Sequence, residues 1–195
     1  MPSQPVTRAL LLAAGVSDAM IRTQLENGRL TRLRDGVFLA TADWPDKPAD
    51  QHLVRAHAEQ VANPGAVISH ASAAVVWGLS NPGFVDWHDS PVSLTRPGRT
   101  SHRGQSSTAT WHSGELPAGA VTRDLDGYPV TSLSRTAVDV AAGLPLPESL
   151  VILDAAGRRL VDSFVGGRSR RSDYANARLV RAARESCCRR RDRGR

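Results

Sequence analysis

The stretch GVSDAMIRTQLENGRLTRLRDGVFLA, residues 15–40, decides how the first part of this chain folds. Ser17 is a typical N-cap residue and Gly28 a typical helix stop, so the residues between them are predicted to form a short helix. Two strand-like runs follow, on either side of Asp35-Gly36, a dipeptide that favours a tight hairpin turn. Within the helix, Ile21 and Leu25 are four residues apart and should face inward together.

Upstream, Thr7 caps a second short helix that Gly15 ends, so the head of the chain reads helix, turn, helix, β-hairpin. We expect an α+β protein in which residues 1–40 form a winged helix-turn-helix. Residues 41–50 (TADWPDKPAD) read as a linker, because two prolines and three acidic residues crowd into ten positions. Residues 51–160 alternate helical and strand patterns and form the main domain, and residues 161–195 are an arginine-rich helical or disordered tail.

Charge is distributed unevenly along the chain, whose formal net charge is +6. Arg158 to Arg195 holds 13 arginines against four acidic residues, residues 1–40 five arginines against three, and the stretch between them is acidic. A basic head and a basic tail favour a nucleic-acid partner. Lys47 is the single lysine beside 24 arginines, which also fits codon bias in a GC-rich genome.

The helix predicted between Ser17 and Gly28 has a polar face on the side opposite Ile21. This face carries the residues that can contact DNA bases. Arg22 can bind a guanine through two hydrogen bonds, and Ala19 and the methyl group of Thr23 can contact thymine. Arginines at the helix exit and on the first hairpin strand are suited to phosphates: Arg29, Arg32 and Arg34. The competing interpretation is that these are solvated arginines on an ordinary exposed helix.

Three motifs resemble one family. Residues 15–40 resemble the winged helix of the AbiEi-type antitoxins, in which a capped helix and a glycine stop precede an arginine-rich strand ending in RGVY. AVISHASAAVVWGL (66–79) is similar to that family's VSHxSAAxLWGL element, and DGYPVTSLSRTAVDVAA (126–142) to its DGIPVTSPARTLLDLA element. The motifs stand in the family's order.

The resemblance implies a transcriptional regulator, often the antitoxin of a nucleotidyltransferase toxin in a type IV system, which represses its own operon at inverted repeats. It places the DNA-contacting helix on residues 17–27, so that Ser17 joins the expected contacts, and the wing on residues 29–38. The chain departs from the family where Asp18, Gln24 and Asp35 replace frequent arginines and Phe38 replaces tyrosine. Only MPSQPV precedes the helix at Thr7, where relatives have another helix, and the nuclease domain of the very-short-patch-repair type that many relatives carry is not included.

Catalysis and cofactors are not expected. Ser69 and His70 are neighbours at a helix start without a nucleophile elbow, so we expect a capping serine and a packed histidine whose side chains diverge. Arg135 and Asp139 have the spacing of a structural ion pair on one helix. The other histidines match no metal motif, and the adjacent pair Cys187-Cys188 lacks further sulfur ligands. The prediction is therefore a non-enzyme without metal or cofactor.

Partners and location follow from the same reasoning. No apolar run reaches the ~18 residues needed to cross a bilayer, which predicts a cytoplasmic protein without membrane contact. One head neutralising about four phosphates gives a salt slope of only about −3.6, so specific binding to double-stranded DNA favours a homodimer. Two alternatives stay open: a truncated or frameshifted relative of a nuclease-bearing protein, whose tail after Glu185 has no function, and a protein-interaction module with a vestigial DNA-binding head.

Overall fold

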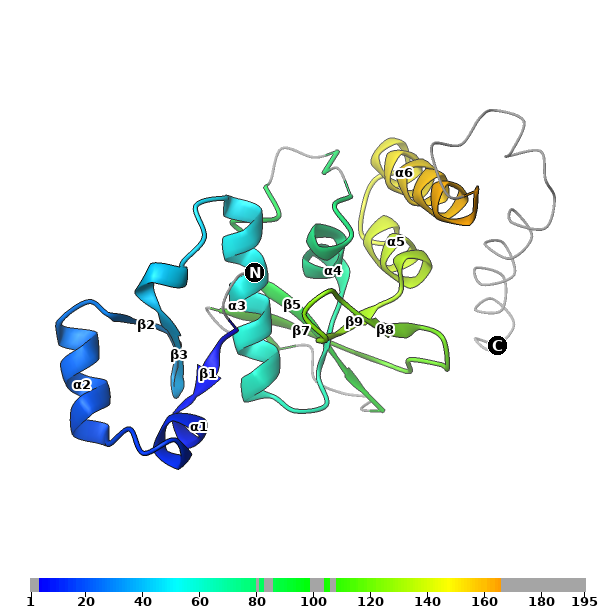
Figure 1. The fold of residues 1–195 in the computed structure, drawn as a ribbon. Helices are drawn as coiled ribbons and strands as arrows, with labels where there is room; N and C mark the ends of the chain where they lie inside the picture. Colours follow the sequence, from blue (N-terminus) through cyan, green and yellow to red (C-terminus); the bar gives the residue numbers. More distant parts are fainter. Residues whose placement is uncertain (1–3, 80, 83–85, 99–103, 106–107, 166–195) are drawn as a thin grey trace.

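A computed structural model describes residues 4–79, 81–82, 86–98, 104–105 and 108–165, and these residues form an α+β fold with two β-sheets (Figure 1). The helices are α1 (Arg8–Ala13), α2 (Asp18–Glu26), α3 (Pro48–Ala62), α4 (His70–Val76), α5 (Leu133–Ala141) and α6 (Leu146–Val165), with a 3-10 turn, η1 (Thr41–Asp43). The strands are β1 (Val6–Thr7), β2 (Leu30–Arg34), β3 (Val37–Ala40), β4 (Val67–Ile68), β5 (Val92–Pro97), β6 (Gly104–Gln105), β7 (Ala109–Gly114), β8 (Val121–Arg123) and β9 (Pro129–Thr131).

The head, residues 4–40, follows the predicted order of helix, helix and hairpin, with one strand added before it. Thr7 and Ser17 cap α1 and α2, their hydroxyls accepting from the backbone N–H groups of Leu10 and Met20. β1 pairs with β3, so the sheet order is β1-β3-β2. A strand of two residues carries no alternation of apolar and polar positions, so no sequence pattern predicts β1.

The centre of the head is the strand β3. All three residues 37–39 are buried, between β1 and β2 within the sheet and against α3 of the main domain. Of the predicted apolar pair on α2, Ile21 is buried and Leu25 is half-buried. The helix α1 has no buried residue, so the head depends on its sheet for most of its apolar packing.

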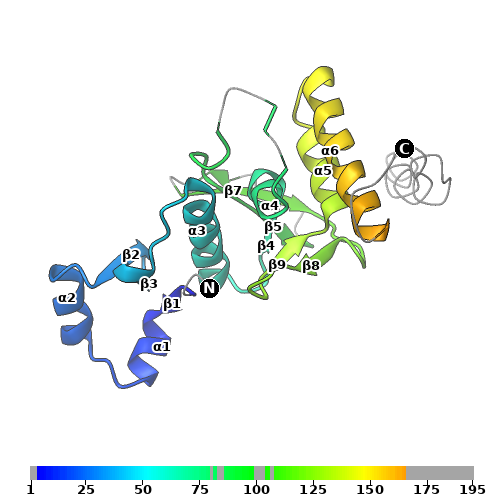
Figure 2. The same ribbon diagram turned by 45° about the horizontal axis from the view of Figure 1, so that its top comes forward.

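The segment 41–50 is ordered where a linker was expected. It contains η1 and the first residues of α3. The Thr31 and Thr41 hydroxyls lie 2.9 Å apart, and the Gln51 side-chain amide donates to the Pro45 carbonyl at 2.9 Å. Because α3 also packs against all three strands of the head, the head is docked on the main domain (Figures 1 and 2).

A mixed six-stranded sheet forms the base of the main domain, in the order β6-β7-β5-β4-β9-β8. β5 pairs in parallel with β7 and β4 with β9, while the other three pairings are antiparallel. Ala56 of α3 and Ala73 of α4 pack on Ile68, Leu94 and other apolar residues of the sheet. β8 and β9 form an antiparallel hairpin around Asp126-Gly127.

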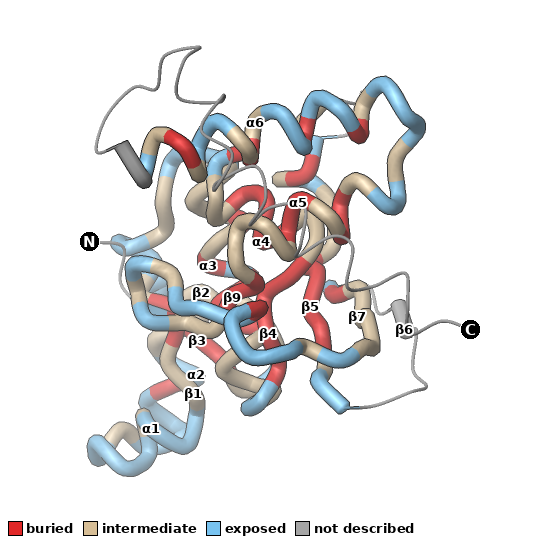
Figure 3. The backbone as a smooth tube through the Cα atoms, turned by 90° about the vertical axis from the view of Figure 1, so that its right-hand side faces the viewer, coloured by how far each residue is buried: buried red, intermediate tan, exposed pale blue. Residues whose placement is uncertain are grey.

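The helices α4, α5 and α6 pack one upon the next, outward from the sheet (Figure 3). Their shared core includes Val75, Val140, Ile152 and Ala156. α6 extends to Val165, beyond residue 160, where the main domain was predicted to end. Most of the predicted basic tail, from residue 166 onward, lies outside the described residues.

Candidate functional site

The outward face of α2 is the first part of the candidate nucleic-acid interface. Ala19, Arg22, Thr23 and Glu26 are all exposed, and the helix packs mainly against β2 of its own hairpin. α2 lies at the end of the molecule away from the six-stranded sheet (Figures 1 and 2). The polar face that the sequence predicted is therefore open to a partner.

The start of α2 is fixed by a contact with α1. The guanidinium of Arg8 binds both carboxylate oxygens of Asp18, with Nε donating to Oδ1 at 2.8 Å. These hydrogen bonds hold the pKa of Asp18 below its usual value. Arg8 thus offsets the negative charge that Asp18 adds at the start of α2.

The wing presents its arginines in different directions. Arg29 and Arg32 are exposed, and the pair of Arg32 with Asp35 is long, at 3.7 Å, with both side chains largely in solvent. An exposed pair of this kind contributes little, so Arg32 can exchange Asp35 for a phosphate.

Arg34 departs from the expected arrangement. Arg34 lies two residues after Arg32 on β2, where regular alternation would turn both side chains to one face, but the strand register shifts between them. The Arg34 guanidinium instead binds the carboxylate of Glu59 on α3, whose side chain is 6% exposed. In this structure Arg34 is thus a docking residue of the wing, and we correct its assignment as a phosphate contact.

Two residues that sequence reasoning missed, Arg8 and Glu59, hold this surface in place. Each acts through a partner distant in sequence: Arg8 through Asp18, and Glu59 through Arg34. No local pattern marks such a pair, because a helix or strand period relates only residues within the same element. Of the seven predicted DNA contacts, Ser17, Ala19, Arg22, Thr23, Arg29 and Arg32 are exposed.

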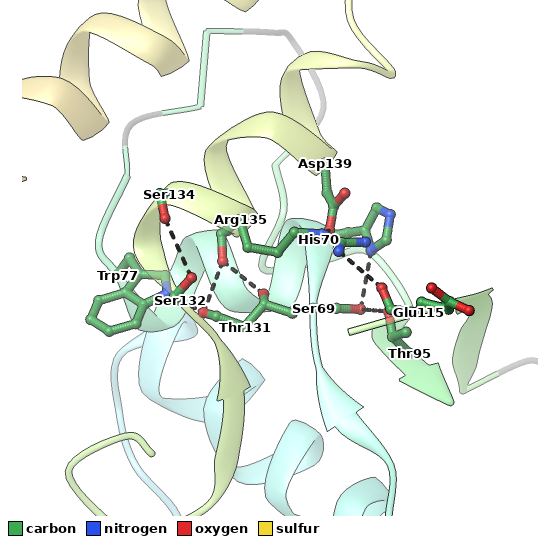
Figure 4. Close-up of polar contacts among 11 residues, drawn as sticks. Ser69, His70, Trp77, Thr95, Glu115, Thr131, Ser132, Ser134, Arg135 and Asp139 are labelled. Atoms are coloured by element: carbon green, nitrogen blue, oxygen red, sulfur yellow. Dashed lines mark hydrogen bonds and ion pairs between the residues drawn. The ribbon is translucent and has the colours of Figure 1, made fainter. Parts of the chain in front are cut away.

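A polar centre in the main domain joins β4, β5, α4 and α5 (Figure 4). The Thr95 hydroxyl donates to Ser69 Oγ at 2.8 Å, and Ser69 Oγ lies 3.1 Å from His70 Nδ1. His70 has a φ of 49°, which turns its ring back toward Ser69, so the prediction that the two side chains diverge was wrong. Ser69 stands at the N-cap of α4 without making the predicted capping bond.

This Ser–His contact lies inside the main domain, and Ser69 is fully buried. The His70 ring stacks on His112 with centroids 3.5 Å apart. Beside them Arg135 binds Asp139, as predicted, and donates to the Glu115 carbonyl at 3.1 Å. The centre thus ties β4, β7 and α5 together.

The two histidines of α3 belong to separate networks. His52 Nε2 lies 2.8 Å from Ser72 Oγ, and His57 Nε2 lies 2.7 Å from Asp124 Oδ2, with the His57 ring stacked on Tyr128. Burial lowers the pKa of His52 to about 4. Over the residues that the structure describes, no group of three or more His, Cys, Asp or Glu side chains is placed to hold a metal ion.

Comparisons with known proteins leave the family of the chain undetermined. No family model matches the sequence, and no curated protein matches it. Among solved structures, the RV2827C protein from Mycobacterium tuberculosis aligns with 80% of this chain and 70% of its own, at 16% identity and a TM-score of 0.43. A likeness that remote supports no functional assignment. Within the described residues, none of the helices is long and apolar enough to cross a membrane.

Proposed function

We propose that this protein is a sequence-specific regulator that binds double-stranded DNA through its head. The observation that carries the proposal is the exposed polar face of α2 beside the exposed arginines of the wing. A short helix of this kind can enter the major groove, where base edges present a readable pattern of donors and acceptors. The hairpin beside it lies where phosphates flank that groove.

Each exposed residue has a role in this proposal. Arg22, near the middle of α2, binds a guanine, while Ala19 and Thr23 contact thymine methyl groups. Ser17 lies at the N-terminal end of the helix, where backbone N–H groups and the helix dipole favour a phosphate. Arg29 and Arg32 bind phosphates on the flanks of the groove.

The narrower biological role rests on the sequence resemblance. An antitoxin of a type IV system would repress its own operon and would have a nucleotidyltransferase toxin as its functional partner. The proposal therefore places the operator upstream of the protein's own gene, as an inverted repeat read by two heads. Co-expression with the product of the neighbouring gene tests the antitoxin role: relief of growth arrest supports it, and arrest that persists at equal protein levels contradicts it.

DNA binding is tested by a gel shift on the region upstream of the gene. We expect Arg22→Ala to weaken specific binding roughly 5- to 150-fold, which corresponds to the about 1–3 kcal/mol that one bidentate base contact contributes. It should have little effect on binding to unrelated DNA, because that binding depends on phosphates. The matched control is Arg123→Ala, which removes an exposed arginine of β8 in the main domain.

The double variant Arg22→Ala, Arg32→Ala decides the assignment of contacts. If it remains folded by circular dichroism and binds the upstream region as tightly as the wild type does, the head does not contact DNA in the proposed manner. If the protein co-purifies with a neighbouring gene product and binds no DNA, the result would instead favour a protein-interaction module.

A further inference from the structure

The outer side of α6 carries an apolar stripe with no partner among the described residues. Leu146 is 73% exposed, Leu150 57% and Leu153 40%. The opposite side of the same helix packs on α5 through Ile152 and Ala156, both buried. Figure 3 shows this division, with exposed residues along the outer side of α6. A cluster of large exposed apolar side chains on one helix marks an interaction surface.

The spacing of the stripe is that of a helix–helix seam. Leu146, Leu150, Leu153, Gly157 and Leu160 follow one another at intervals of four, three, four and three residues, the repeat that keeps one side of a helix against a partner helix. The first three are exposed, and Gly157 and Leu160 are half-buried. At Gly157 an added Cβ would have no neighbour within 4 Å. The backbone of a partner can therefore approach closely at that position.

We propose that α6 pairs in antiparallel orientation with α6 of a second copy of this chain, about a two-fold axis near residue 155. In this register Leu150 packs against the partner's Leu160, and Leu153 packs over the partner's Gly157. Each of these contacts occurs twice, as a two-fold interface requires.

Charge complementarity supports a second copy as the occupant. Asp154 and Arg158 flank the seam and form a pair with 3.0 Å between Nε and Oδ2, yet both side chains are about two-thirds exposed. An antiparallel partner brings its own Arg158 toward Asp154 and its own Asp154 toward Arg158. The same helix thus supplies both halves of a four-charge network.

The position of the stripe also favours a second copy over the continuation of this chain. The most exposed residue, Leu146, is the first of α6, whereas the chain continues from the opposite end of the helix at Val165. A helix of 20 residues is about 30 Å long, so the following segment would have to run back along its whole length to cover Leu146.

The interface does not require DNA binding, but one consequence rests on the proposed function. The head and α6 lie at opposite ends of the molecule (Figures 1 and 2), so pairing through α6 places the two heads at the outer ends of the dimer. The half-sites of an operator would then be separated by more than one turn of DNA.

The test is the mass of the full chain in solution without DNA, measured by light scattering across a concentration series. We expect the wild type to be a dimer and Leu150→Glu with Leu153→Glu to be a folded monomer, with dimerisation weakened at least 100-fold. The matched control, Leu125→Glu, changes a fully exposed leucine on the β8–β9 turn and should remain dimeric.

A charge exchange tests the orientation of the helices. Asp154→Arg alone should weaken dimerisation, because it faces the partner's Arg158, and Asp154→Arg with Arg158→Asp should restore it. Failure of the double variant to restore the dimer would overturn the antiparallel register. A monomeric wild type would overturn the interface itself, since another segment or another protein would then cover the stripe. Dimers that persist in Leu150→Glu with Leu153→Glu would also overturn it, because dimerisation would then use another surface. A dimer that does not bind DNA would leave this inference standing and contradict the proposed function alone.

Discussion

Arg34 of the wing and Glu59 of α3 form an ion pair that joins the head to the main domain. The pair is largely removed from water, and the register shift after Arg32 turns Arg34 inward while Arg32 stays in solvent. Two arginines that look equivalent in the sequence therefore differ in role. One docks the wing and the other is available to a partner.

Loss of Arg34 should destabilise the protein strongly. We expect Arg34→Ala to lower the free energy of unfolding by about 3 kcal/mol, because the Glu59 carboxylate is left buried without its cation. Arg34→Met with Glu59→Gln should cost less than that single change, since no uncompensated charge remains. Urea denaturation followed by circular dichroism measures both. The matched control is Arg32→Ala, for which a loss above about 0.5 kcal/mol would argue against the distinction between the two arginines.

Arg32 should control the salt dependence of DNA binding. Removing one phosphate contact lowers the magnitude of the slope of log K against log salt by about 0.9. We therefore expect Arg32→Ala to reduce the slope by that amount, and Arg34→Ala, measured where it is folded, to leave the slope unchanged. Fluorescence anisotropy with a labelled upstream duplex gives the slopes. Equal reductions in the two variants would mean that Arg34 leaves Glu59 to bind a phosphate.

The Ser17 hydroxyl should stabilise α2 through its cap. It accepts from the backbone N–H of Met20 at 3.2 Å, so Ser17→Ala should cost about 1 kcal/mol of stability. Ser17→Asp keeps an accepting oxygen and should retain most of that stability, yet its negative charge should weaken phosphate binding. Thermal unfolding and anisotropy separate the two effects. If Ser17→Asp binds DNA as tightly as the wild type, Ser17 does not lie beside a phosphate.

His52 should make stability depend on pH. Burial lowers its pKa to about 4 in the folded protein, from the ordinary 6.5 of an unfolded chain. Between those values the unfolded state holds the extra proton, so stability falls as pH decreases from 6.5 toward 4. The slope is at most about 1.4 kcal/mol per pH unit, and the loss is about 3 kcal/mol in total.

The hydrogen bonds of His52 agree with a neutral ring. Ser93 donates its backbone N–H to Ser72 Oγ at 2.8 Å, which leaves the Ser72 hydrogen for His52 Nε2, while Nδ1 lies 3.2 Å from the His88 carbonyl. We expect His52→Gln to be less stable at pH 7 but to lose less stability on acidification. Urea unfolding at pH 4.5, 5.5 and 7 checks this, and parallel curves for the two proteins would contradict it.

Local patterns predicted most elements of the head and much of the main domain. Capping residues, glycine stops and turn dipeptides act within a few residues of chain, so they located α1, α2 and the hairpin of the head. The same patterns extended to the ion pair of Arg135 and Asp139, which lie one helical turn apart. They could not reveal β1, which exists only because β3 lies beside it.

The sequence by itself determined where the helices and turns of the head lie and which side of α2 is polar, because these depend on the period of a helix and on backbone conformation. The tertiary structure alone decided which arginine of the wing faces solvent, since that required a strand bulge and a glutamate 25 residues away. It likewise decided that α6 buries one apolar side and exposes another. The sequence shows which residues of α6 are apolar, but which of them a neighbouring helix covers depends on the packing of the whole fold.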